Sequence, residues 1–424
     1  MSAGRFLVFF VLLLVALGGI NLQVFRWARN GFQLGPRGRR RLKAVLWLSL
    51  AGTVLGRVAG RYWPGTLTTF VVASASTAEL AVIISGILLL VVDAARALFG
   101  LPAWLGRRLG RPSTKLATAS APAPESQPEP ALPVPAALLR RTFLTRAAAG
   151  SAFLIGGGSS LYGALKGRHD YSIEVVPFKL PGLPRALDGF SIAQLSDVHI
   201  GVYVGEAELR VAEELLRKAK PDLIVLTGDL LDSDARLAEL LGRFVRRLTP
   251  LARAGVVAIS GNHDYFAGVE EMASAVTRAG ARMLRNEGMV IGEAGAQFGL
   301  LGVDDVYARR DGGGPDLPRA LASLRSSANT GEAALDLPRV LLCHNPSFFA
   351  ESAGKVGLQL SGHTHGGQIN LGLRPADYLL PGGWVAGRYD QSGSALYVNR
   401  GFGTVGPPVR LGAPPEVTRI VLTA

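Results

Sequence analysis

The sequence GHTHGGQ at residues 362–368 decides how the C-terminal part of this chain is interpreted. It follows an apolar run at residues 356–360, which predicts a buried strand, and glycines flank its two histidines. On a strand, positions i and i+2 share a face, so we expect His363 and His365 to point at neighbouring places. Imidazole is the commonest metal ligand in proteins, and the chain has only six histidines. We therefore interpret this stretch as part of a metal site.

Other short segments upstream of this stretch also end in polar residues. From about residue 171, β-rich runs alternate with helical patterns and with glycine or aspartate turns, which predicts an α/β domain at residues 171–424. Further strands are expected at residues 190–196, 222–227, 256–260 and 340–343. Open α/β sheets carry their sites outside the carboxyl ends of the strands, where these strands place metal-binding side chains. The donors collected in this way are Asp197, His199, Asp229, Asn262, His344, His363 and His365.

This donor set offers oxygen and nitrogen ligands but no thiolate. Such sites suit Mn, Fe or Zn, whereas a thiolate-rich structural zinc site would need more cysteines than the single Cys343. Seven side chains are more than one ion normally uses, so two divalent metal ions that share a carboxylate form the economical arrangement. Paired ions can clamp a phosphoryl group and activate water near neutral pH.

The ordered motifs D-x-H, G-D-x-x-D, G-N-H-D, H and G-H-x-H resemble those of the calcineurin-like metallophosphoesterase superfamily. The resemblance extends over essentially the whole domain from about residue 171. The tail, with N-R-G-F-G at residues 399–403 and P-V-R at residues 408–410, is similar to the bacterial membrane-anchored, twin-arginine-associated branch. The resemblance implies a four-layer αββα sandwich, in which two packed mixed sheets are flanked by helices.

The resemblance also implies a role for each matching residue. One ion would take Asp197, His199, Asp229 and His365. The second would take Asp229, Asn262, His344 and His363, with Asp229 bridging the two ions. His263 matches the histidine that protonates the leaving oxygen or stabilises the developing charge, and Asp232 matches the carboxylate that can orient it.

The implied activity is hydrolysis of a phosphodiester, or of a phosphomonoester as the second choice, by in-line attack of a metal-bound hydroxide. One alternative is a non-catalytic, metal-dependent binding or scaffold module, which would not need His263 together with Asp232. Another is a membrane transporter or sensor centred on residues 1–100. Only Glu79 and Asp93 supply acidic groups there, too few to describe a substrate pathway.

The N-terminal third reads as a membrane region. Apolar runs at residues 6–25, 44–60 and 66–92 predict about three transmembrane helices within residues 1–100. Glu79 lies inside the third run, and we expect it near a helix end or facing another helix. The basic, Ala/Pro-rich residues 101–146 predict a cytoplasmic linker. After Arg140–Arg141, the mild apolar run at residues 147–165 predicts a fourth span or a twin-arginine-type signal anchor.

The charge distribution supports a membrane rather than nucleic acid as the partner. The formal net charge is +13, but residues 1–150 hold 18 of the 45 Lys and Arg residues and only 4 of the 32 Asp and Glu residues. The basic excess therefore belongs to the apolar region, where it sets the orientation of the spans. With the basic loops in the cytoplasm, the chain is expected to be a multi-pass cell-membrane protein with its catalytic domain outside. A phosphate ester and the lipid bilayer are the expected partners, and the oligomeric state is open.

Overall fold

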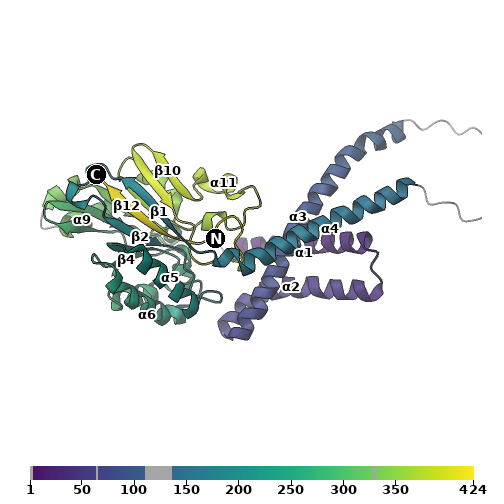
Figure 1. Cartoon of the computed structure of the whole chain (residues 1–424), viewed down its shortest axis with the longest axis horizontal. Helices are drawn as coiled ribbons and strands as arrows, with labels where there is room; N and C mark the ends of the chain where they lie inside the picture. Colours follow the sequence, from purple (N-terminus) through teal and green to yellow (C-terminus); the bar gives the residue numbers. More distant parts are fainter. Residues whose placement is uncertain (1–2, 64, 110–135, 328–330) are drawn as a thin grey trace, which may run out of the picture. The chain divides into compact units, whose positions relative to one another are not determined.

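The computed structural model describes residues 3–63, 65–109, 136–327 and 331–424. Contacts divide the chain into two compact units, of which the first comprises residues 1–54 and 74–160. The second comprises residues 55–73 and 161–424. The first unit is helical, and the second contains all the strands of the described residues (Figure 1).

Two mixed six-stranded sheets form the centre of the second unit. The first sheet has the strand order β1 (Ser172–Lys179), β12 (Glu416–Thr423), β2 (Ser191–Leu195), β3 (Leu223–Thr227), β4 (Val256–Ile259) and β5 (Arg282–Met283). The second has the order β10 (Gly387–Gln391), β11 (Ser394–Val398), β9 (Leu358–Ser361), β8 (Arg339–Leu342), β7 (Ala296–Gly302) and β6 (Glu287–Glu293). Strands β2, β3 and β4 run parallel to one another, and so do β7, β8 and β9. The five predicted strands are confirmed.

Side chains alternate along the central strands, so the first sheet contributes to two hydrophobic cores, one on each of its faces. On β3, Leu223 and Val225 point into the core between the sheets, while Ile224 and Leu226 point into the core under the helices. Period-two alternation requires this when both faces of a strand are buried. Residues 223–226 of β3 and the whole of β4 are therefore apolar at every position, as expected of buried parallel strands.

Helices cover the outer faces of the two sheets. Helices α5 (Glu206–Ala219), α6 (Ala238–Leu248) and α8 (Val269–Arg278) pack on the first sheet, and α9 (Leu317–Ser327) packs on the second. Figure 1 shows α5 and α6 next to β2 and β4 of the first sheet. The shorter helices are α7 (Asn262–Ala267), α10 (Phe349–Ser352) and α11 (Ala376–Leu379). The order helix, sheet, sheet, helix confirms the four-layer αββα fold.

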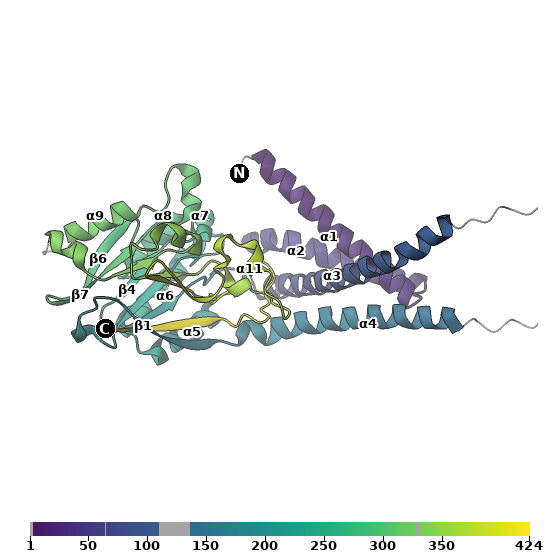
Figure 2. The ribbon, with the colours of Figure 1, turned by 90° about the horizontal axis from the view of Figure 1, so that it is seen from above.

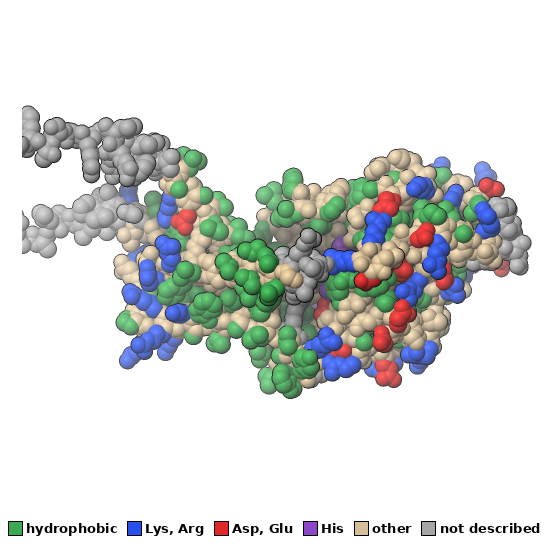
Figure 3. Space-filling view, turned by 180° about the vertical axis from the view of Figure 1, so that it is seen from behind, with side chains coloured by type: hydrophobic (Ala, Val, Ile, Leu, Met, Phe, Trp, Pro, Cys, Tyr) green, Lys and Arg blue, Asp and Glu red, His purple; other side chains and the backbone are tan. Residues whose placement is uncertain are grey.

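Four longer helices precede the domain (Figure 2): α1 (Ala3–Gly31), α2 (Pro36–Tyr62), α3 (Thr66–Leu109) and α4 (Ala136–Leu165). Within the described residues, two stretches are long and apolar enough to cross a membrane, Phe10–Gly31 and Thr66–Phe99. The space-filling view shows hydrophobic side chains over this region and Lys and Arg side chains gathered toward one end of it (Figure 3). The segments predicted to span at residues 44–60 and 147–165 are helical but less apolar.

The predicted linker at residues 101–146 differs from the structure at both ends. Helix α3 continues to Leu109, and α4 already begins at Ala136, where Ala and Leu, two strong helix formers, follow one another. The paired Arg140–Arg141 therefore lies inside a helix rather than in a linker. The rest of the predicted linker, residues 110–135, lies outside the described residues.

Glu79 faces other helices, as predicted. Its carboxylate accepts hydrogen bonds from Asn21 Nδ2 at 2.7 Å and from Ser49 Oγ at 2.8 Å, and the residue is almost fully buried. A buried carboxylate in an apolar helix bundle needs such partners because it has no water to replace them. These hydrogen bonds link α1, α2 and α3 through one side chain.

We predict that Leu300→Ala lowers the free energy of unfolding of the domain by about 2–5 kcal/mol, because Leu300 is fully buried between the sheets. The same substitution at Leu373, which is 74% exposed, should change it by less than about 0.5 kcal/mol. Urea unfolding of the full chain in detergent, followed by tryptophan fluorescence, measures both. Equal losses would contradict the assignment of Leu300 to a packed core between the sheets.

Candidate metal centre

The predicted donors gather where the central strands of both sheets end. Each donor follows its strand directly or within a few residues: Asp197 and His199 after β2, Asp229 after β3, Asn262 after β4, His344 after β8, and His363 and His365 after β9. The last two strands belong to the second sheet and the others to the first. The site is therefore built across the two sheets.

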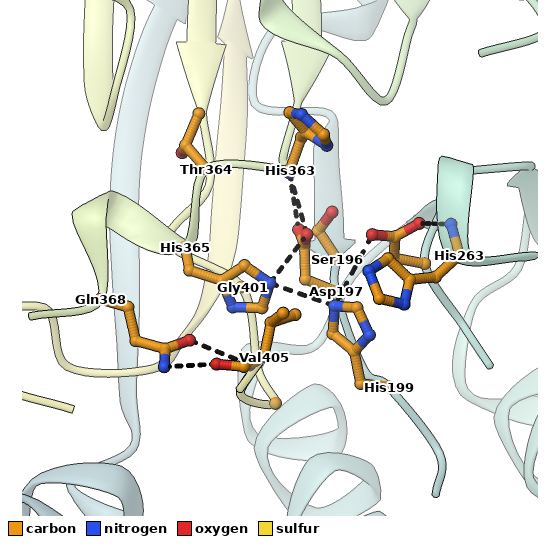
Figure 4. Close-up of polar contacts among 12 residues, drawn as sticks. Ser196, Asp197, His199, His263, His363, Thr364, His365, Gln368, Gly401 and Val405 are labelled. Carbon is orange, nitrogen blue, oxygen red and sulfur yellow. Dashed lines mark hydrogen bonds and ion pairs between the residues drawn. The ribbon is translucent and has the colours of Figure 1, made fainter. Parts of the chain in front are cut away.

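Asp197, His199 and His365 form a first cluster, shown in Figure 4. The Nε2 atoms of His199 and His365 lie 3.1 Å apart, and His365 Nε2 lies 3.5 Å from Asp197 Oδ1. The three residues are buried. The Asp197 carboxylate also accepts the backbone N–H of His363 at 2.9 and 3.0 Å, which fixes its orientation.

Asp229, His344 and His363 form a second cluster. His344 Nε2 lies 3.2 Å from Asp229 Oδ2 and 3.2 Å from His363 Nδ1. The Nδ1 of His344 lies 2.8 Å from the carbonyl of Thr227, which can only accept, so Nδ1 carries the proton. Burial alone would lower the pKa of His344, but the nearby carboxylates of Asp229 and Asp197 raise it. In the neutral form of His344, the Nε2 lone pair is directed into the cluster.

Asp229 lies between the two clusters. Its Oδ2 is 3.2 Å from His344 Nε2 in the second cluster and 3.6 Å from His199 Nε2 in the first. Its Oδ1 accepts the backbone N–H of His263 at 2.7 Å. Burial would raise the pKa of this carboxyl, but the surrounding imidazoles hold it far below its usual range. An ionised carboxylate in this position can serve both clusters.

The chemistry of these donors fits a pair of divalent cations. Two pairs of imidazole nitrogens face each other at 3.1 and 3.2 Å inside a buried space. The Oδ1 of Asn262 is buried and has no hydrogen-bond partner among the described residues. Buried polar atoms are nearly always satisfied in proteins, so such an orphan calls for a ligand. One cation bound by the donors of each cluster would satisfy these nitrogen and oxygen atoms. Donors of this kind suit Mn, Fe or Zn.

The expectation that His363 and His365 share one face of a strand is wrong. Strand β9 ends at Ser361, and both histidines lie in the following turn with positive φ angles of 72° and 51°. Gly366, with φ of 61°, continues this left-handed backbone. The turn sends His363 to the second cluster and His365 to the first.

His263 lies beside both clusters, at the start of α7. Its Nδ1 is 2.8 Å from the carbonyl oxygen of Asp232 and 3.4 Å from the Asp232 carboxylate, and its ring meets that of His199 edge-on at 4.6 Å. Burial disfavours the charged imidazole, but the hydrogen bond to Asp232 and the charge of Asp229 outweigh it and raise the pKa of His263. The pairing of His263 with Asp232 that the sequence predicts is present, and the carbonyl oxygen of Asp232 lies closer to His263 than its carboxylate does.

Two residues that support the site escaped the sequence reasoning. Asp264 is fully buried and accepts backbone N–H groups from Leu230, Leu231 and Gly261, each at 2.9 Å. Burial and the charge of Asp229 raise the pKa of Asp264 to about 7. It belongs to the quoted G-N-H-D motif, so its position was visible although its role was not.

Arg410 is the second such residue. It is 1% exposed, its Nη2 lies 3.2 Å from His365 Nδ1, and its guanidinium donates to the carbonyls of Gly403, Arg400, Gly401 and Ala413. Burial lowers the pKa of Arg410 to about 10, so it remains charged at neutral pH. The P-V-R motif marked the residue, but only the tertiary structure shows that it lies behind a predicted ligand.

Comparison with known proteins identifies relatives of the domain. A family profile described as Calcineurin-like phosphoesterase matches residues 190–367. Uncharacterized metallophosphoesterase YkuE of Bacillus subtilis is 32% identical over 295 residues, which cover 67% of this chain and 97% of that protein. A bovine "Transmembrane protein with metallophosphoesterase domain" is 31% identical over 280 residues, which cover 62% of this chain and 60% of that protein.

Among solved structures, a dimetal phosphatase from Danio rerio is similar to the domain. It shares 13% sequence identity, with a TM-score of 0.34, and the match covers 51% of this chain and 88% of that one.

We predict that Asp264→Asn lowers the free energy of unfolding by about 1–3 kcal/mol, because one amide –NH₂ must then face a backbone N–H. The matched control is Asp390→Asn, since the Asp390 side chain is 61% exposed and its one ion pair among the described residues is with Arg388 on the surface. Urea unfolding of the full chain compares the two variants. An Asp264→Asn chain as stable as the control would show that these three hydrogen bonds do not hold the loops together.

Proposed function

This chain belongs to the calcineurin-like metallophosphoesterase family, and from that membership we propose that it is a membrane-anchored, dinuclear-metal phosphoesterase. A phosphodiester is the first substrate class and a phosphomonoester the second. The observation that carries the proposal is the pair of donor clusters, buried except for the half-buried His363, with Asp229 between them.

In this proposal, Asp197, His199, Asp229 and His365 hold one ion, and Asp229, Asn262, His344 and His363 hold the other. When bound, the ions would activate water for in-line attack on phosphorus and neutralise charge on the phosphate oxygens. The chain contributes pre-orientation of its donors. His344 Nδ1–H donates to the Thr227 carbonyl, which fixes the tautomer of His344. The His363 backbone N–H donates to the Asp197 carboxylate, which fixes the orientation of that carboxylate.

His263 is the proposed proton donor to the leaving oxygen. Its Nδ1–H is engaged by the Asp232 carbonyl, so Nε2 is the atom available to the substrate. A raised pKa keeps a larger fraction of His263 protonated near neutral pH, which suits an acid rather than a base. A non-catalytic scaffold would not need His263, a further histidine that is held beside the donors by Asp232 but is not one of them.

The membrane part of the proposal rests on the apolar helices and on the charge bias of residues 1–150. Two helices long and apolar enough to span, and a curated relative described as a transmembrane protein, support membrane association. We propose that the domain lies on the extracytoplasmic side, since the basic excess favours cytoplasmic placement of the helix connections. A lipid head group or another envelope phosphate ester is then the nearest substrate.

The decisive test is to purify the full chain in detergent, measure bound metal, and assay a panel of soluble and lipid phosphodiesters and phosphomonoesters. We expect about two divalent ions per chain and activity on at least one class. Asp229→Asn should remove metal and activity together, because one residue serves both clusters, whereas Asp390→Asn should keep both. A metal-free wild-type chain, or full activity in Asp229→Asn, would refute the proposal.

We predict that His263→Ala lowers turnover by roughly 10²–10⁴-fold, the usual contribution of a positioned acid, with little change in metal content. His169→Ala is the matched control, since His169 is exposed and lies outside both clusters. Steady-state kinetics and elemental analysis on the same preparations separate the two effects. Loss of both ions in His263→Ala would instead make His263 a ligand.

A further inference from the structure

An unusually apolar loop lies next to the candidate metal centre. Residues 371–380, here called the 371–380 loop, contain the short helix α11 and expose Leu371, Leu373, Tyr378 and Leu379 by 47%, 74%, 85% and 78%. Within residues 166–424, only three other large hydrophobic side chains are comparably exposed in the described structure: Val175, Val211 and Phe266. Single exposed apolar residues are ordinary, but four within ten residues form a patch that water disfavours.

The loop packs on the turn that carries His363 and His365. Asn370 Nδ2, just before the loop, donates to the carbonyl of Gly366 at 3.0 Å. A β-carbon on Gly367 would lie 3.1 Å from Arg374 Cγ and 3.4 Å from Ala376 Cβ. The turn and the loop are thus in direct contact, so whatever the loop binds is brought to the metal centre.

The loop also lies at the edge where helix α4 enters the domain. The carbonyl of Gly163, in the last turn of α4, accepts the N–H of Arg410 at 3.2 Å. The next residue, Leu411, receives the N–H of Asn370 at 2.8 Å and donates to Gln368 at 2.9 Å. A continuous set of backbone hydrogen bonds therefore runs from the end of α4 to the start of the loop.

The chemistry of this edge fits lipid better than protein or water. The end of α4 is itself apolar and exposed, with Leu161, Tyr162 and Leu165 exposed by 55%, 57% and 71%. The two charged residues of the loop, Arg374 and Asp377, form an ion pair at 2.7 Å, so the loop has no net charge to keep it in water. Tyrosine beside leucine is the composition found at membrane interfaces.

We propose that the 371–380 loop inserts into the interface of the lipid bilayer and holds the metal centre against phosphate esters carried by lipids. The bilayer is the occupant because the same chain carries helices able to cross it, and α4 leads from that region to this edge. The proposal rests on the phosphoesterase function proposed above for the choice of substrate. The insertion itself does not depend on that function.

The insertion is tested with the full chain in nanodiscs of phosphatidylethanolamine and phosphatidylglycerol. The sole native cysteine, Cys343, is buried, so Leu379→Cys and the control Lys218→Cys, on the exposed face of α5, can be labelled selectively with an environment-sensitive fluorophore. We expect lipids with a quencher in the acyl chain to quench the label at 379 but not at 218, and iodide to do the reverse.

Equal quenching by iodide at both positions would overturn insertion, because the loop would then lie in water. A label at 379 shielded from both iodide and lipid quencher would also overturn it and would identify a protein, such as a second copy of the chain, as the occupant.

A double variant, Leu373→Ser with Leu379→Ser, tests the consequence for substrate delivery. We expect a loss of about tenfold or more on a phosphate ester lipid in the same nanodiscs, with less than about a twofold change on a soluble phosphodiester. Equal losses on the two substrates would overturn the delivery role and indicate a structural one. A wild-type chain inactive on every ester would refute the proposed function, yet the quenching result would still decide insertion.

Discussion

The candidate centre depends on a backbone constraint at the strand ends. Five of the seven predicted ligands have left-handed φ angles between 51° and 72°: Asp197, His199, Asp229, His363 and His365. Such conformations cost on the order of 1–3 kcal/mol each for residues other than glycine, although Asp and His tolerate them better than most. They turn the side chain out of the strand direction as soon as the strand ends. The donors can therefore converge on a small volume instead of continuing along their own sheets.

Hydrogen bonds between neighbouring strand ends hold this strained backbone. The N–H of Asp197 donates to the carbonyl of Gly228, and that of His199 to the carbonyl of Asp229. Across the sheets, the His363 N–H binds the Asp197 carboxylate, and a β-carbon on Gly362 would collide with that carboxylate and with Ser196. The close approach of the sheets thus requires glycine at this position. It also makes the site a product of the inter-sheet core, because neither sheet holds either cluster alone.

Much of this arrangement could be predicted from the sequence because strand ends and donor types are local features. The strands before Asp197, Asp229 and His344 were readable as apolar runs, and α/β topology then brought their ends together. The conformation of the turn after β9 was not readable, so the first interpretation of His363 and His365 failed. The part played by Asp264 was equally hidden, because its three N–H partners come from two separate loops. The linker bounds failed because helix propensity near Ala136 outweighed the Pro-rich character of the segment before it.

Arg410 contacts both the end of α4 and the first donor cluster. Its backbone N–H donates to Gly163 in the last turn of α4, and its guanidinium lies against the His365 ring. The next residue, Leu411, is hydrogen-bonded to Gln368 and Asn370, just before the 371–380 loop. A fully buried guanidinium is stable only when its donors are satisfied, and here backbone carbonyls of the surrounding loop supply most of the partners. Arg410 and the residue after it therefore connect the last turn of α4, the start of the 371–380 loop and the His365 ring.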